Sequence, residues 1–294
     1  MNKIHYNKTF IALTLGALLA ACGGGGGGGS TTETAPTLTL ASGGEKSVSS
    51  TFSGTTLQTV GSVTATNNAT SIVGSITMDN SGNISALTIK HSNGTTETYN
   101  TSNGDKIFRY ASGGETAIGA FNAAKTTAAA LLVADESTIA NTYKRSGSVF
   151  TAESRFAGNK TKALASSIIS SATYNGYLIG TLQTSGTTPR YTTARVTMSA
   201  NFTNKSIAFS TSDMALRNMQ QAQFAILSSN HELTGTLSDP DGNNEYTGTV
   251  TDTAGRTGTL EVNVMGANAN EVAGTGSVTD NTTTNHTFAV WGER

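Results

Sequence analysis

The chain has 294 residues, of which 36% are hydrophobic and only 13% are charged, and its formal net charge at pH 7 is -1. This balance lacks the basic excess that nucleic-acid binding needs. The single cysteine excludes intramolecular disulfides and Cys-rich zinc sites. The polar character of the chain comes from uncharged side chains rather than charged ones, with about fifty threonines among them, and the chain also holds 33 glycines. Because threonine is β-branched and suits a pleated surface, the composition favours β-structure over a helical bundle.

Residues 1–21 are typical of a bacterial signal peptide. Two lysines precede an apolar run, Phe10 to Ala21, which at about twelve residues is too short to span a bilayer as a helix. The run ends in Leu19-Ala20-Ala21-Cys22, which resembles the lipobox of bacterial lipoproteins, where the cysteine is acylated. We therefore expect lipidation at Cys22. The alternative is an ordinary secretory signal that happens to precede a cysteine.

Residues 22–45 are predicted to carry the lipid anchor and a flexible tether. Seven consecutive glycines, Gly23–Gly29, follow the cysteine, and a Thr- and Ala-rich stretch comes after them. A flexible coil of about twenty residues spans about 25 Å, and several acyl chains on one cysteine give stable membrane anchoring. Because Gly23 rather than aspartate follows the cysteine, the segment resembles that of lipoproteins sorted to the outer membrane.

Residues 46–169 are expected to form a β-rich domain. The stretch Asn83–Tyr99 is typical of a hairpin, because apolar residues flank Ser92-Asn93-Gly94 and Asn-Gly is the strongest short hairpin signal. The stretch Ala117–Ala134 is rich in alanine and leucine and is the best helix candidate of the region, although Thr126-Thr127 weakens it.

The sequence of residues 170–294 predicts an eight-stranded antiparallel β-barrel. The chain as a whole is predicted to be mainly β. Apolar and polar residues alternate from Ala194 to Phe202, as in a strand with one buried face, and similar short runs recur to the end of the chain. Glycines inside strands, as in Thr234-Gly235-Thr236, indicate tight coiling. About eight strands make an interior that side chains just fill. Polar outward positions disfavour the alternative of a membrane-spanning barrel.

No catalytic motif is found, so we expect a protein that is not an enzyme. The dipeptide His231-Glu232 begins an H-E-x-x-H pattern, but Gly235 stands where the second histidine belongs; His231 is expected to be a solvated turn residue. His91, beside the Asn-Gly turn, is a candidate haem ligand, since imidazole binds iron; a plain surface histidine is the alternative. The acidic segment Asp239–Glu245 lacks the EF-hand positions and is expected to be a hairpin turn. No metal site is expected.

Five stretches of the barrel region together carry a family resemblance. They are Tyr174–Gly180, Val196–Ile207, Asn230–Gly235, Met265–Gly274 and Phe288–Gly292. In this order they resemble the C-terminal barrel of transferrin-binding protein B-like surface lipoproteins, a group that includes factor H binding protein and haemophore-like relatives. With a single barrel, the chain resembles the single-lobe members, in which residues 46–169 would be the handle domain.

The resemblance implies a surface-exposed outer-membrane lipoprotein that binds a host protein or an iron or haem source. Loops of the barrel mouth and of the handle would carry the binding. The resemblance also implies that a dedicated surface-lipoprotein assembly translocon carries the chain across the outer membrane. Two alternatives stay open: a haemophore-like haem carrier with His91 as ligand, and a structural lipoprotein that faces the periplasm without a ligand.

Overall fold

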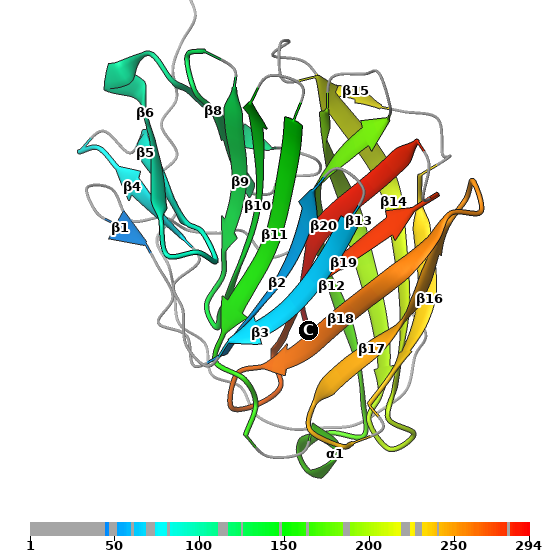
Figure 1. The fold of residues 1–294 in the computed structure, drawn as a ribbon. Helices are drawn as coiled ribbons and strands as arrows, with labels where there is room; N and C mark the ends of the chain where they lie inside the picture. Colours follow the sequence, from blue (N-terminus) through cyan, green and yellow to red (C-terminus); the bar gives the residue numbers. More distant parts are fainter. Residues whose placement is uncertain are drawn as a thin grey trace, which may run out of the picture. The chain divides into compact units, whose positions relative to one another are not determined.

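The computed structural model describes residues 45–46, 52–59, 62–68, 74–80, 83–110, 117–124, 126–146, 149–162, 165–184, 189–218, 224–226, 231–239, 241–280 and 283–294. The chain divides into two units, residues 1–34 and 35–294, and all described residues belong to the second. Antiparallel strands in three sheets make up nearly all of their secondary structure (Figure 1). The expected signal peptide, Cys22 and the glycine tether lie outside the described residues.

The C-terminal sheet closes into an eight-stranded antiparallel barrel, as the sequence predicted. Its strand order is β13-β12-β20-β19-β18-β17-β16-β14-β15, and an additional pairing of β13 with β14 completes the circle, which leaves β15 at the edge. The bounds are β12 Ser171–Thr184, β13 Arg190–Asn201, β14 Ser206–Asn218, β15 Phe224–Ile226, β16 Leu233–Ser238, β17 Glu245–Asp252, β18 Thr257–Met265, β19 Glu271–Thr279 and β20 Thr284–Glu293.

Alternating side chains fill the interior of the barrel. In β13, Val196, Met198 and Ala200 are buried while the residues between them are exposed, because successive side chains of a strand point to opposite faces. The aromatic members of the interior cluster are Tyr174, Phe202, Phe209, Tyr246 and Phe288. The sequence pattern of period two therefore identified the buried face of this strand correctly.

Glycines inside the barrel strands allow close approaches that a side chain would prevent. A Cβ added at Gly276 would lie 2.8 Å from the ring of Phe288, and one added at Gly274 would lie 1.9 Å from the carbonyl oxygen of Glu261. The first glycine makes room for an aromatic ring inside the barrel. The second lets two neighbouring backbones approach, as expected where strands coil tightly.

A seven-stranded sheet packs against the outside of the barrel. Its order is β3-β2-β11-β10-β9-β8-β7. The cluster that joins it to the barrel includes Tyr143 and Phe156 from the sheet and Ile179, Ala289 and Trp291 from the barrel. The strand bounds are β2 Phe52–Thr59, β3 Ser62–Asn68, β7 Lys106–Tyr110, β8 Ala117–Phe121, β9 Thr127–Val133, β10 Ser137–Ser146 and β11 Val149–Gly158.

The predicted helix at Ala117–Ala134 is wrong, because this stretch forms β8, a turn and β9. In β9, Ala128 and Ala130 pack toward the barrel, while Ala129 and Leu131 pack on the opposite face of the sheet. A strand that is buried on both faces reads as a continuous apolar run, which periodicity alone does not distinguish from a buried helix.

A four-stranded sheet in the order β1-β4-β5-β6 covers the other face of the seven-stranded sheet (Figure 1). Its apolar contact includes Ile76, Leu87, Ile89 and Tyr99, all nearly fully buried. The bounds are β1 Glu45–Lys46, β4 Gly74–Met78, β5 Ile84–Lys90 and β6 Thr96–Asn100, followed by the 3-10 turn η1, Thr101–Asn103. The hairpin predicted at Asn83–Tyr99 is confirmed as β5 and β6.

A short linker with one helical turn, α1 (Ala165–Ile168), connects β11 to β12. Ala165 belongs to the interior cluster of the barrel, and its N–H donates to Asn244 Oδ1 over 2.8 Å. The linker is therefore attached to the end of the barrel where β17 begins. No helix in the described part of the chain is long and apolar enough to span a membrane.

Candidate functional site

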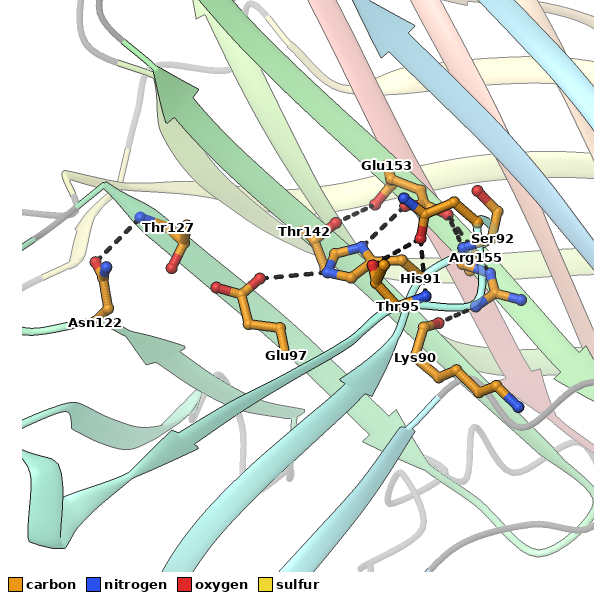
Figure 2. Close-up of polar contacts among 11 residues, drawn as sticks. Lys90, His91, Ser92, Thr95, Glu97, Asn122, Thr127, Thr142, Glu153 and Arg155 are labelled. Atoms are coloured by element: carbon orange, nitrogen blue, oxygen red, sulfur yellow. Dashed lines mark hydrogen bonds and ion pairs between the residues drawn. The ribbon is translucent and has the colours of Figure 1, made fainter.

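His91 is the first residue of the turn that joins β5 to β6. The backbone N–H of His91 donates to the carbonyl of Thr95 over 2.8 Å, and the backbone carbonyl of His91 accepts from the N–H of Gly94 over 2.9 Å. Asn93 Oδ1 accepts from the N–H of Thr95 over 3.0 Å. The turn is thus held by local hydrogen bonds, and Figure 2 shows the imidazole directed from it toward β11 of the seven-stranded sheet.

Both ring nitrogens of His91 face carboxylates. Nδ1 lies 3.0 Å from Glu153 Oε2, and Nε2 lies 3.3 Å from Glu97 Oε2 (Figure 2). A neutral imidazole carries only one N–H, so two carboxylate partners favour the imidazolium. The hydrogen bond with Glu153, followed by that with Glu97, raises the pKa of His91 to about 9, although burial opposes the change.

Glu153 connects the hairpin turn to β11. It is 7% exposed, and its Oε1 accepts from the N–H of Ser92 over 2.8 Å and lies 3.7 Å from Arg155 Nε. Arg155 also donates to the carbonyl of Lys90. Burial would raise the pKa of Glu153, but the hydrogen bonds from His91 and Ser92 outweigh it and lower that pKa. We call His91, Glu97, Glu153 and Arg155 the hairpin cluster.

The contacts of the hairpin cluster compete with the expected role of His91 as a haem ligand. Iron is bound by an unprotonated imidazole nitrogen, whereas both nitrogens of His91 are directed at carboxylates. Binding haem would therefore require His91 to leave Glu153 or Glu97. The haem-ligand role stays a prediction, while the observed contacts attach the four-stranded sheet to the seven-stranded one.

The raised pKa of His91 predicts a stability that falls in alkaline solution. Because the pKa is about 9 in the folded chain and 6.5 as the reference value, the contribution is fully present below pH 6.5 and is lost as the pH rises through 9. Solvent screening reduces it to about 1–2 kcal/mol. We expect His91→Gln to lower the free energy of unfolding at pH 6 and to lower it by clearly less at pH 10, where the imidazole is neutral. Urea titrations at the two pH values measure this, and an equal loss at both would contradict it.

The other histidines occupy different environments. His231 is half-buried, and its Nδ1 lies 2.5 Å from Arg256 Nη2, so it is not simply a solvated turn residue. His286 is buried in the barrel, where its Nε2 lies 2.8 Å from Thr192 Oγ1. Burial lowers the pKa of His286 to about 3, so this imidazole is neutral.

The acidic segment Asp239–Glu245 forms the expected turn, between β16 and β17. Asp239 accepts from the backbone N–H groups of Gly242, Asn243 and Asn244 at 2.8–3.1 Å, so its carboxylate stabilises the turn itself. Among the described residues, no group of three or more His, Cys, Asp or Glu side chains is placed to hold a metal ion.

No protein-family model matches the chain, and no curated protein matches it. Its fold is similar to that of several solved structures. One is a mutant of the vaccine antigen transferrin binding protein B from Haemophilus parasuis Hp5, with 11% identity and a TM-score of 0.47; the match covers 82% of this chain and 44% of that one. The chain thus spans less than half the length of that protein.

Two other similar structures come from different binding proteins. The haemoglobin receptor HpuA from Kingella denitrificans has 9% identity and a TM-score of 0.40, and the match covers 90% of each chain. The N-lobe of lactoferrin binding protein B from Moraxella bovis has 13% identity and a TM-score of 0.34, with 66% of this chain and 80% of that one covered. The likeness is one of fold, a β-barrel with a β-sheet region before it.

Proposed function

We propose that the chain is a lipid-anchored protein of the outer membrane that is exposed at the cell surface and binds a host protein. In this proposal Cys22 carries the acyl chains, residues 22–45 form the tether, residues 46–169 form the handle and residues 170–294 form the barrel. The partner is a host protein or an iron source carried by one, and a surface-lipoprotein assembly translocon delivers the chain.

The observation that carries the proposal is a folded body of three packed sheets in a chain whose earlier sequence holds Leu-Ala-Ala-Cys and seven consecutive glycines. The barrel interior is occupied by its own aromatic and aliphatic side chains, which favours recognition on the outside. Loops on a rigid scaffold are well suited to recognition. The similar structures include transferrin-, lactoferrin- and haemoglobin-binding proteins, and a binding role rather than catalysis agrees with the absence of a catalytic motif in the sequence.

Capture from serum tests the host-protein partner. The full chain, solubilised from membranes and immobilised, is incubated with mammalian serum, and retained proteins are identified by mass spectrometry. We expect one serum protein to be retained by the folded chain and lost from a heat-unfolded control. If the folded and unfolded chains retain the same proteins, the proposed host-protein binding is wrong.

Haemin titration decides between this proposal and the haem-carrier alternative. Because both nitrogens of His91 face carboxylates, we expect the Soret band of haemin to be the same with the wild-type chain and with His91→Ala. A shifted Soret band that weakens in His91→Ala would support the haem carrier instead. The variant His231→Ala is the matched control for loss of a half-buried histidine.

A further inference from the structure

A buried carboxylate lies where the seven-stranded sheet meets the barrel. Glu271, the first residue of β19, is 2% exposed. Its Oε1 accepts from the backbone N–H groups of Asp135 and Glu136 at 3.1 and 2.9 Å. Its Oε2 accepts from Ser137 Oγ at 2.6 Å and from Trp291 Nε1 at 3.0 Å. One carboxylate thus receives four hydrogen bonds from neutral donors.

The four donors come from two different sheets. Asp135, Glu136 and Ser137 form the turn between β9 and β10 and the start of β10, whereas Trp291 lies on β20 of the barrel. A buried carboxylate is costly unless hydrogen bonds satisfy it, and bonds to an ionised acceptor are stronger than neutral ones. Both oxygens of Glu271 are satisfied only when the β9–β10 turn lies against this end of the barrel.

A glycine turn just before Glu271 allows the β9–β10 turn to approach the barrel. Gly266 has φ +81°, and a Cβ added there would lie 3.0 Å from Glu136 Cγ. Its N–H donates to the carbonyl of Asn159 over 2.7 Å, and its carbonyl accepts from Thr161 Oγ1 over 2.6 Å. A glycine at this position therefore allows both the left-handed turn and the approach of the β9–β10 turn and the linker.

We infer that Met265–Glu271 is the polar docking site on the barrel for the β9–β10 turn of the seven-stranded sheet, and that Glu271 is the residue that positions this turn. The recognised group is a turn that presents two backbone N–H groups and a serine hydroxyl. The stretch Met265–Gly274, singled out in the sequence, thus has a specific role in joining two parts of the fold. Without the carboxylate, this end of the sheet loses its main polar contact while the barrel keeps its own strand pairing.

Trp291 gives a direct readout, because it is the one tryptophan of the chain and donates to Glu271 itself. In the full chain, Glu271→Ala is expected to shift the tryptophan emission to longer wavelength. It is also expected to raise the rate of proteolysis in the β9–β10 turn at Asp135–Glu136, whose backbone N–H groups Glu271 holds, about tenfold or more. Glu271→Gln keeps one acceptor oxygen and is expected to fall between Glu271→Ala and the wild type.

Glu232→Gln is the matched control, since it removes one carboxylate beside β16, at the opposite end of the barrel strands, and should change neither readout. If Glu271→Ala does not fold, Ser137→Ala decides, because it removes a single donor and is expected to shift the emission in the same direction. Wild-type emission and wild-type cleavage rates in the Glu271 variants, or in Ser137→Ala in their place, would overturn the inference.

Discussion

Replacing Glu153 with glutamine is expected to lower the free energy of unfolding by about 3 kcal/mol at pH 7. The carboxylate is 7% exposed and has His91 Nδ1 at 3.0 Å and the N–H of Ser92 at 2.8 Å (Figure 2). Glutamine retains an acceptor for Ser92 but removes the buried negative charge that lies beside the imidazolium and the Arg155 guanidinium. Urea denaturation at pH 7, followed by circular dichroism, measures the loss.

Glu97→Gln is the matched control for this substitution. Its carboxylate accepts from the other ring nitrogen of His91 at a longer distance of 3.3 Å, and its side chain is more exposed, at 25% against 8% for Glu153. We expect a loss of about 1 kcal/mol for Glu97→Gln. Because His91 and Glu153 are in contact, the double variant His91→Gln with Glu153→Gln should lose less than the sum of the two single variants. Equal losses for Glu153→Gln and Glu97→Gln, or additive losses in the double variant, would contradict this description of the hairpin cluster.

Replacing Gly274 with alanine is expected to destabilise the barrel by about 3 kcal/mol. The new Cβ would lie 1.9 Å from the carbonyl oxygen of Glu261 and 2.8 Å from the Cα of Val262. Both atoms belong to the backbone of β18, which pairs with β19 through this position. Because β18 and β19 would have to separate, we expect the whole barrel to be destabilised. Thermal unfolding of the full chain measures the loss of stability.

Gly255→Ala separates this steric effect from the conformational cost of losing a glycine. Gly255 has φ +82°, and a Cβ added there would meet no atom within 4 Å. Its replacement should cost only about 1 kcal/mol, from a left-handed backbone conformation in an exposed turn. If the two alanine variants lose the same stability, close approach between β18 and β19 is not the reason for glycine at position 274.

The barrel could be predicted from the sequence because its strands bury one face. Alternation from Ala194 to Phe202 gave the buried side of β13 directly, and the turn at Asn93-Gly94 gave the hairpin of β5 and β6. The burial of β9 on both faces removes the alternation of apolar and polar residues, so the sequence of Ala117–Ala134 predicts a helix where the chain forms strands. A strand with one buried face alternates apolar and polar residues, and this alternation can be recognised in the sequence. A strand buried on both faces has no polar side and therefore no alternation.

The contacts of the candidate site could not be predicted, because its members are far apart along the chain. The sequence indicates His91 as a candidate ligand, but its partner Glu153 is 62 positions away. The sequence offers one signal, the opposite charges of Glu153 and Arg155 on one face of β11, since two such charges need a partner once buried. Glu271 likewise belonged to a recognised stretch, but its donor Ser137 lies 134 positions away.

Protease treatment of intact cells tests the proposed surface-anchored protein most directly. Cells that express the full chain are treated with a protease, and the chain is followed by immunoblot beside a periplasmic marker protein. We expect the chain to be degraded while the marker stays intact, and we expect Cys22→Ala to be no longer retained on the cells. A chain that is protected until the cells are lysed would contradict surface exposure and would favour the structural lipoprotein that faces the periplasm.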